Sequence, residues 1–370
     1  MKKYLSLFAS LFLFCNLLHN SDRYSIILPE NDTVTLVFAG DIMGHSPQYH
    51  AAYNPISKTY SYDICFQPVK KYIESADIAV ANLEVPIAGA PYSGFPGFSS
   101  PDALLDGLKY AGFDVLLTAN NHTLDRKKAG MERTINQIEQ RGFYHAGSYI
   151  DKIQRDSLYP LIIESRGLKI AFLNCTYGTN KYLPTNPNIV NYIDTLEIKN
   201  SIQQADKLGA DFKVMTIHWG NEYQLREDTT QQRLAQFLVN HGINLIIGSH
   251  PHVVQEAEFL YSKDSIPVPV FYSLGNFISN QRKPNTNGGI IACVEIGSKS
   301  KTILRTSYLP VYVYKGVLND IYQYHLIPTT DFIDKPSKFP INKTDSIALT
   351  YFDRETRLKL KNIKLLHQAI

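Results

Sequence analysis

Two histidines separated by a single proline end an apolar run in the segment 246–252, which reads IIGSHPH. Burying two imidazoles on a turn costs desolvation free energy, which a bound ligand would offset. We expect the glycine to let backbone approach the site, Pro251 to stiffen the turn, and His250 and His252 to point toward one or two cations. Neutral imidazole nitrogens are common ligands of transition metals. The segment therefore indicates a metal site.

Four other apolar runs also end in polar residues. They contribute Asp41, Asn82, Glu84, Asn120, Asn121, His122 and His218. Each alone has an ordinary alternative: Asp41 as a turn residue, Glu84 as a surface carboxylate, NNHTLD as an Asx turn that opens a helix, and His218 as a hydrogen-bonded core residue. Ligands bind at the carboxyl ends of strands in open α/β sheets, so five such ends rich in Asp, Glu, Asn and His favour one shared metal site.

The types of ligand atom limit which metal ions fit this site. The set has too few oxygen donors for a calcium cage and no sulfur for a structural zinc site, which leaves one or two divalent Mn, Fe or Zn ions.

The segments between these runs place apolar residues at helical spacing. Helical patterns cover PDALLDGLKYAG, KAGMERTINQIEQRG, IKNSIQQADKLG and TTQQRLAQFLVNHG, and each ends at a glycine. Alternation of strands and helices predicts an α/β fold. Residues 160–174 instead predict two strands joined at Arg166 and Gly167, and VPVFYSLGNF and GGIIACVEIG add further strands, so the sheet is expected to be mixed.

Six ordered motifs resemble the capsule-synthesis protein family of the CapA type, which is linked to poly-gamma-glutamate synthesis. They are GDIMGH, ANLEVPI, NNHTLD, IHWGNEY, IIGSHPHVVQ and YSLGNF, within residues 33–296. That family is similar to calcineurin-like metallophosphatases. The resemblance implies an α/β four-layer sandwich, with two mixed β-sheets flanked by helices and a two-metal site. The implied domains are a metallophosphatase-like domain over 33–297 and a small C-terminal extension over 298–370.

The resemblance also implies roles for individual residues. The implied metal ligands are Asp41, Glu84, Asn121, His218, His250 and His252. Glu84 stands where the superfamily has its bridging carboxylate, Asp41 and His252 belong to one ion, and the other ligands belong to the second. His122 matches the catalytic histidine that protonates a leaving group.

This chain departs from the superfamily pattern at two positions. The histidine ligand usually found two residues after the first aspartate is replaced by Met43, and His45 lies two residues further on. A thioether is a poor ligand for Mn, Fe or Zn in such company. We therefore expect the ion bound by Asp41 and His252 to be held more weakly, unless His45 replaces the missing imidazole. The bridging residue is also a glutamate where phosphatases use an aspartate.

Three further residues are candidates for supporting roles. Glu222, four residues after His218, could act in catalysis by orienting water or a ligand histidine, or it could cap the following helix. Asn276 in SLGNF could brace the site or close a turn. Asn82 is an accessory candidate at its strand end.

Three classes of function fit these features. The first is an exported metal-dependent hydrolase, because bound metals activate water and clamp the attacking and leaving oxygens of a phosphoester. The second is a non-catalytic assembly factor that holds an anionic surface polymer, and the third is a scaffold that has lost its chemistry. We rank a CapA-like role in capsule or poly-gamma-glutamate biosynthesis first, with hydrolysis as its chemistry. An anionic polymer or phosphoester is the expected substrate, and membrane-bound capsule synthesis proteins are the expected partners.

Composition and the N-terminus indicate the compartment. The chain of 370 residues has a net charge of +3 and no basic stripe, so no nucleic-acid partner is expected. Residues 1–22 have two lysines followed by an apolar run, which is typical of a signal peptide or an N-terminal anchor and is short for a standard membrane span. We expect an exported protein, periplasmic or associated with the cell envelope. Cys15 is either a lipid-attachment site or an ordinary signal residue.

The rest of the sequence adds little chemistry. Cys65, Cys175 and Cys293 are widely spaced and odd in number, so we expect buried thiols without a disulfide framework. Residues after 297 predict one or two strands and a basic amphipathic helix. That helix could pack on the core or lie on a membrane, and the interspersed Asp353 and Glu355 favour packing.

Overall fold

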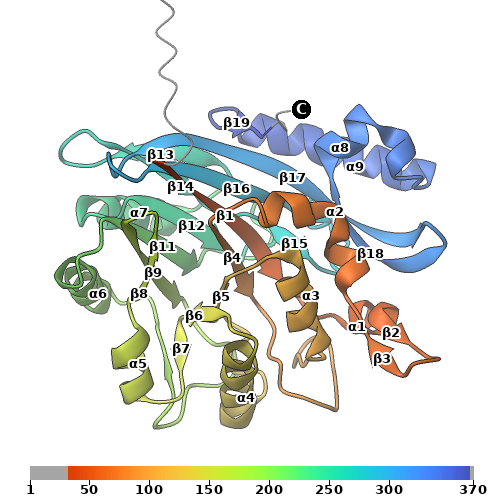
Figure 1. Ribbon diagram of the computed structural model, residues 1–370, viewed down its shortest axis with the longest axis horizontal. Helices are drawn as coiled ribbons and strands as arrows, with labels where there is room; N and C mark the ends of the chain where they lie inside the picture. The colour runs from red at the N-terminus through yellow and green to blue at the C-terminus, as the bar shows by residue number, and fades with distance from the viewer. Residues whose placement is uncertain (1–31, 367–370) are drawn as a thin grey trace, which may run out of the picture. The chain divides into compact units, whose positions relative to one another are not determined.

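Two β-sheets face each other in the computed structural model, which describes residues 32–366 (Figure 1). The larger sheet contains, in spatial order, β18 (Ile321–Pro328), β17 (Ile303–Leu318), β16 (Gly288–Gly297), β1 (Thr33–Ile42), β4 (Ile78–Leu83), β5 (Val115–Leu117) and β6 (Tyr144–Ala146), with β15 (Asn276–Ile278) beside β1 and β19 (Lys364–Leu365) beside β17. The smaller sheet contains β13 (Ala257–Tyr261), β14 (Pro267–Phe271), β12 (Leu245–Ser249), β11 (Phe212–His218), β9 (Leu168–Thr176) and β8 (Leu161–Ser165). Two short pairs join β2 (Tyr53–Asn54) to β3 (Thr59–Tyr60) and β7 (Ser148–Tyr149) to β10 (Ile189–Val190).

Both sheets are mixed, as the sequence predicted. β1, β4, β5 and β6 run parallel, whereas β16, β17 and β18 form an antiparallel extension of the same sheet. In the smaller sheet β9, β11, β12 and β14 are parallel, with antiparallel edge strands β8 and β13. The predicted hairpin turn at Arg166 and Gly167 is present, and both residues have positive φ. The parallel strands bring their carboxyl ends to one edge of each sheet.

Helices flank the two sheets. They are α1 (Ser46–Ala52), α2 (Asp63–Ile73), α3 (Ala103–Ala111), α4 (Lys127–Gln140), α5 (Lys152–Leu158), α6 (Thr195–Lys207), α7 (Thr229–Asn240), α8 (Thr329–Asp334) and α9 (Lys343–Lys359), with a 3₁₀ turn at Pro336–Lys338. The four predicted helices correspond to α3, α4, α6 and α7. Gly112 caps α3 in the left-handed conformation, with φ of 99°, as the glycine stop signal predicted.

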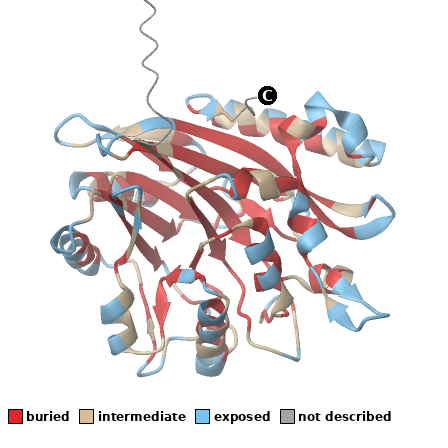
Figure 2. Ribbon diagram, viewed as in Figure 1, coloured by how far each residue is buried: buried red, intermediate tan, exposed pale blue. Residues whose placement is uncertain are grey.

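Three apolar clusters define the layers. One lies between the sheets and includes Phe38 from β1 and Phe172 from β9. A second joins the outer face of the larger sheet to α2 and α3, and a third joins the outer face of the smaller sheet to α6 and α7. Both sheets are buried along most of their length (Figure 2). This order of helices, sheet, sheet and helices is the predicted four-layer sandwich.

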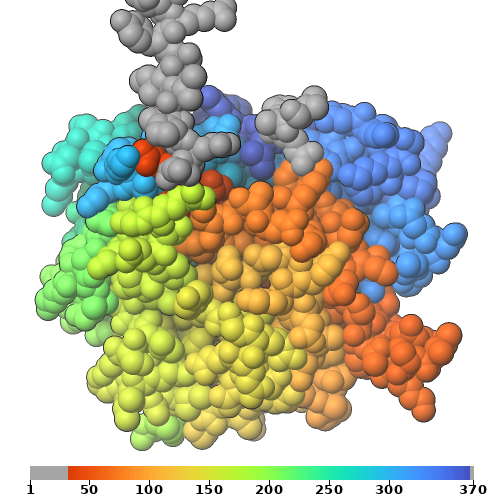
Figure 3. All heavy atoms as spheres, viewed as in Figure 1, coloured from red at the N-terminus to blue at the C-terminus, as the bar shows by residue number. Residues whose placement is uncertain are grey.

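The C-terminal region is built onto the larger sheet. β17 pairs with β16 along most of its length, and β18 packs beside α1 and α2, where Figure 3 shows blue and orange segments side by side. Leu349 and Phe352 of α9 are buried in the cluster between the sheets. The expectation that this helix packs on the core is confirmed. Residues from Thr33 onward cluster as one compact unit.

Other expectations concern the cysteines and the N-terminus. Cys65, Cys175 and Cys293 are buried free thiols, as predicted. Within residues 32–366, no helix is long and apolar enough to cross a membrane. The signal or anchor over 1–22, including Cys15, lies outside the described residues.

Candidate metal centre

The first group of candidate ligands comes from the larger sheet. Asp41 lies at the end of β1, where a register shift after Ala39 aligns it with Asn82 of β4. Gly40 makes this possible, because a Cβ at that position would lie 2.0 Å from the carbonyl oxygen of Gly275. The same Gly275 oxygen accepts a hydrogen bond from the Asp41 backbone N–H at 3.0 Å. Glu84 follows the end of β4 and is fully buried.

The second group comes from the smaller sheet. His218 ends β11 opposite Ser249 of β12, and the SHPH turn follows directly. His250 and His252 both have positive φ, at 99° and 58°, so the turn holds two non-glycine residues in the left-handed region. A Cβ on Gly248 would lie 2.0 Å from the Tyr272 carbonyl oxygen. The glycine is therefore needed because the Tyr272 backbone lies against it, which differs from the expected role of letting backbone approach the site.

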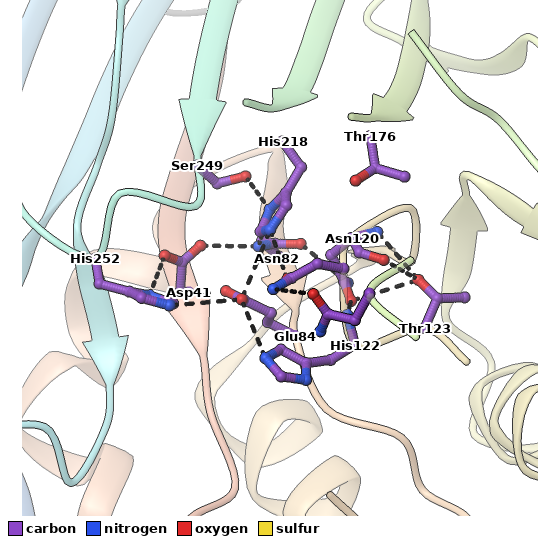
Figure 4. A network of polar contacts seen from close by, with 12 residues as sticks. Asp41, Asn82, Glu84, Asn120, His122, Thr123, Thr176, His218, Ser249 and His252 are labelled. Atoms are coloured by element: carbon purple, nitrogen blue, oxygen red, sulfur yellow. Dashed lines mark hydrogen bonds and ion pairs between the residues drawn. The ribbon is translucent and has the colours of Figure 1, made fainter. Parts of the chain in front are cut away.

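These side chains converge between the two sheets (Figure 4). Glu84, His218 and His250 offer ligand atoms within 4.8 Å of one another, and so do Asp41, Glu84 and His252. Asn121 joins the first group, because its Oδ1 lies 2.9 Å from Nε2 of His218. The structure thus places the six predicted ligands in two groups that share Glu84. We call this arrangement the metal centre and its shared side chain the shared carboxylate.

The shared carboxylate supports a cation at this place. Neither oxygen of Glu84 has a hydrogen-bond partner, although both are buried. Its Oε1 lies 3.6 Å from Nε2 of His218, 3.7 Å from Nε2 of His252 and 4.0 Å from Nε2 of His122. Nδ1 of His250 is also buried without a partner. Buried polar atoms normally have partners, and a bound cation would provide one for each of these. The donor set fits a divalent metal.

The pKa shifts describe the same site without metal. Burial raises the pKa of Glu84 well above its ordinary value, and the nearby Asp41 carboxylate raises it further. Burial, followed by the neighbouring His250, lowers the pKa of His218 well below its ordinary value. Burial also lowers the pKa of His250 to about 3. Both imidazoles are therefore neutral at pH 7, which is the form that binds metals.

Hydrogen bonds orient the candidate ligands. Asn82 donates from Nδ2 to Oδ1 of Asp41 at 2.8 Å, and Oδ2 of Asp41 lies 3.0 Å from Nδ1 of His252. Because the carboxylate can only accept, His252 carries its proton on Nδ1 and leaves Nε2 free to face the centre. The Ser249 hydroxyl lies 3.0 Å from Nδ1 of His218. Asn82 thus supports the site, as the sequence suggested for this residue.

Asn276 braces the SHPH turn. Its amide donates to the carbonyl oxygens of His252 at 3.2 Å and Thr286 at 2.8 Å. It also stands opposite Asp41 in the pairing of β15 with β1. Of the two roles considered from sequence, bracing is the one that these contacts support.

His122 lies at the margin of the metal centre, and the Asp125 carboxylate contacts its other ring nitrogen. Its Nδ1 lies 2.7 Å from Oδ2 of Asp125, and the same oxygen accepts the Phe98 backbone N–H at 3.0 Å. The Phe98 ring packs edge-on against the imidazole with centroids 4.7 Å apart. The Asp125 carboxylate therefore holds the proton on Nδ1 and directs Nε2 toward Glu84.

Three predicted or considered residues lie outside both ligand groups. Met43 is buried in the apolar cluster under α2 and α3. His45 contacts Gln48 through Nδ1 at 3.1 Å, and burial lowers the pKa of His45 to about 4. Glu222 is exposed, and its charge is one of the causes, after burial and Asp41, that raise the pKa of Glu84. The alternative that Glu222 caps the next helix is wrong, because Asp228 is the N-cap of α7.

Sequence reasoning missed two residues beside the metal centre. Asp125 was part of the NNHTLD motif but received no role, and its distance from His122 is set by a turn that spacing alone does not define. Tyr177 follows the end of β9, and its ring centroid lies 4.6 Å from that of His250. Burial and the Glu222 charge raise the pKa of Tyr177 to about 12. A strand-end signal existed for Tyr177 too, because NCTYG closes β9 in the same way.

Comparison with known proteins identifies the family to which the chain is similar. A family model described as bacterial capsule synthesis protein PGA_cap matches residues 35–281. The capsule biosynthesis protein CapA of Bacillus anthracis is 25% identical over 347 residues, which cover 90% of this chain and 78% of that protein. The PGA biosynthesis protein CapA of Bacillus subtilis (strain 168) is 26% identical over 343 residues, covering 90% of this chain and 86% of that protein.

A solved structure shares the fold. NAD nucleotidase from Haemophilus influenzae aligns with 88% of this chain and 60% of its own, with a TM-score of 0.50 and 12% identity. Such low identity shows the fold alone, which is metallophosphatase-like. The resemblance seen in the six sequence motifs is confirmed by the family match, which covers well over half of the chain and both sheets of the metal centre. The chain belongs to the bacterial capsule synthesis protein family PGA_cap.

Proposed function

We propose that this CapA-like protein is a metal-dependent hydrolase that cleaves an ester or amide bond in an anionic substrate during capsule or poly-gamma-glutamate biosynthesis. The observation that carries the proposal is the shared carboxylate, buried without a partner between two sets of nitrogen and oxygen donors. A purely structural core would leave such a group uncompensated. The family supports the biological setting.

The donor set favours Mn, Fe or Zn. Glu84, Asn121, His218 and His250 would hold one ion, and Asp41, Glu84 and His252 the other. When bound, the metal would activate water and offset negative charge on the substrate oxygen. Three imidazoles among the donors favour these transition metals over Ca²⁺.

The chain itself can supply the proton for the leaving group. His122 is held by Asp125 with Nε2 directed to the margin of the metal centre, 4.0 Å from Oε1 of Glu84. A proton on Nε2 would pass to the departing oxygen or nitrogen, and Asp125 would stabilise the imidazolium that precedes this transfer. Burial of His122 excludes bulk water from that proton.

The test begins with chelator-treated protein reconstituted with Mn²⁺, Fe²⁺ or Zn²⁺. Each form is assayed on a p-nitrophenyl phosphodiester and on γ-linked glutamate oligomers, with bound metal measured in parallel. We expect hydrolysis of one substrate class that follows metal content and is lost in His218→Ala. His122→Asn should lower turnover while retaining metal. Full metal occupancy without turnover on either class would favour the non-catalytic role of holding an anionic polymer.

Compartment and partners form part of the same proposal. The charged and apolar start of the sequence supports export to the periplasm or cell envelope. Membrane-bound capsule synthesis proteins would be neighbours there. Cell fractionation tests this, and an intact N-terminus in the soluble cytoplasmic fraction would contradict it.

A further inference from the structure

Three cationic side chains gather beside the metal centre. Arg282 and Lys283 lie on the loop between β15 and β16, and Lys315 lies on β17. The Lys283 ammonium is 3.7 Å from the ring centroid of Tyr223. Arg282 and Lys315 approach the ring of Tyr324, at 5.8 Å and 5.6 Å from its centroid. We call these three cations the basic cluster.

The basic cluster lacks carboxylate partners. Within residues 32–366, none of its members lies within ion-pair distance of an Asp or Glu side chain, whereas Arg133 and Arg305 elsewhere on the surface are paired with acids. Lys315 lies near the like charge of Arg282, and its pKa is lowered first by burial and then by that charge. Cations held close together without acids favour an external anion.

Short contacts connect the basic cluster to the metal centre. The ring of Tyr223, under Lys283, lies 6.2 Å from that of His252. On the other side, the hydroxyl of Tyr324 hydrogen-bonds Asn280, and the backbone N–H of Asn280 lies 3.3 Å from Nδ1 of His45. The Tyr223 side chain therefore lies between Lys283 and His252, whereas Asn280 and His45 lie between Tyr324 and the metal centre.

We propose that Arg282, Lys283 and Lys315 form a second anion-binding subsite, which holds a negatively charged group of the substrate next to the group that reaches the metal centre. The proposal rests on the proposed function for the site, and it restricts the substrate to molecules with at least two anionic groups. Carboxylate and phosphate groups share the required chemistry, because both accept several charge-assisted hydrogen bonds from Arg and Lys. Glu222 contacts Tyr223 beneath Lys283, and its single negative charge is smaller than the positive charge of the three cations.

The test measures binding separately from hydrolysis. Chelator-treated protein is titrated against a fluorescein-labelled γ-linked glutamate oligomer at low ionic strength, with inorganic tripolyphosphate as competitor. The triple variant Arg282→Gln/Lys283→Gln/Lys315→Gln should bind at least about tenfold more weakly than wild type, because it loses three charge-assisted contacts. The relative affinities of the two probes distinguish carboxylate from phosphate recognition.

A matched control removes the same charge elsewhere. Three exposed lysines on other elements are changed together, as Lys207→Gln/Lys263→Gln/Lys364→Gln. This control should bind the oligomer within about twofold of wild type, because only long-range charge is lost. Equal loss in both triple variants, or no binding of either probe to wild type, would overturn the proposal.

Hydrolysis of a small phosphodiester separates the two proposals. The three-lysine control should keep wild-type turnover on a p-nitrophenyl phosphodiester, which has one negative charge, and the basic-cluster variant should lose less activity on this substrate than it loses affinity for the oligomer. If no metal form hydrolyses any substrate while oligomer binding still depends on the basic cluster, the proposed function fails and the subsite stands. If hydrolysis is observed but the triple variant binds both probes as wild type does, the subsite fails alone.

Discussion

Replacing Glu84 by glutamine removes the charge of the shared carboxylate while keeping the size of the side chain. In the metal-free protein this carboxyl group has a pKa well above its ordinary value of 4.5, first because it is buried and then because Asp41 is near. The folded state therefore keeps a proton that the unfolded chain releases as the pH rises above that value. This difference in bound protons makes stability depend on pH.

The extra proton on Glu84 sets the sign and size of the change in the free energy of unfolding with pH. Above about pH 4.5 the folded wild type binds one more proton than the unfolded chain, so its free energy of unfolding falls as the pH rises toward the raised pKa. The slope is about 1.4 kcal/mol per pH unit for one proton. Glutamine does not titrate, so the difference in pH slope between the two proteins reports the Glu84 carboxyl group. The metal-free Glu84→Gln protein should therefore become the more stable of the two as the pH rises.

Metal reverses this order. A cation that binds only the folded state, at a hundredfold excess over its Kd, adds about 2.7 kcal/mol to the free energy of unfolding. Glu84→Gln should gain much less, because it weakens a ligand that belongs to both groups. Metal-loaded wild type should therefore be more stable than metal-loaded variant.

Urea denaturation provides the assay. The protein has one tryptophan, Trp219, which is 2% exposed, so its fluorescence reports unfolding. Wild type and Glu84→Gln are compared from pH 5 to 8, with and without metal, and Glu164→Gln on the exposed side of β8 serves as control. The same pH slope in wild type and Glu84→Gln, or equal stabilisation of both by metal, would contradict the role assigned to the shared carboxylate.

Three other predictions follow from the site. Asp125→Asn should lower turnover on the order of a hundredfold with metal content unchanged, because His122 loses the carboxylate that fixes its tautomer; steady-state kinetics with metal analysis checks this. Gly248→Ala should destabilise by at least roughly 1–3 kcal/mol in urea denaturation, because the new Cβ meets a backbone carbonyl, while Gly97→Ala, with nothing within 4 Å, should stay within about 0.5 kcal/mol. Titration of metal-free protein with metal should show one tight and one weaker binding site. Equal affinities of the two sites in both wild type and His45→Ala would contradict this prediction.

The positions of the candidate ligands could be predicted because they depend on a local signal. Each follows an apolar run, and parallel strands bring their carboxyl ends to the same edge. His218, His250 and Asp41 are examples in which strand periodicity and residue type sufficed. Their division into two groups came from the family resemblance, and the structure places the side chains accordingly.

Other features depend on contacts that no local pattern encodes. Asp125 reaches His122 only through the geometry of one turn, and Tyr177 reaches His250 only because β9 and β12 both pair with β11. Met43 stands in a strand-end motif, yet it packs into the apolar cluster, because the register of β1 decides which face each side chain occupies. The antiparallel extension by β17 and β18 likewise requires knowledge of strand order.

The donors of the metal centre come from both β-sheets of the sandwich, and this has a mechanical consequence. Asp41 and Glu84 belong to one sheet, whereas His218, His250 and His252 belong to the other. A cation bound to all of them would act as a cross-link between the sheets at their carboxyl edge. Loss of metal would then increase local opening at that edge, visible as faster amide hydrogen exchange near the ends of β1 and β12, while the opposite edge of the sandwich would exchange as before.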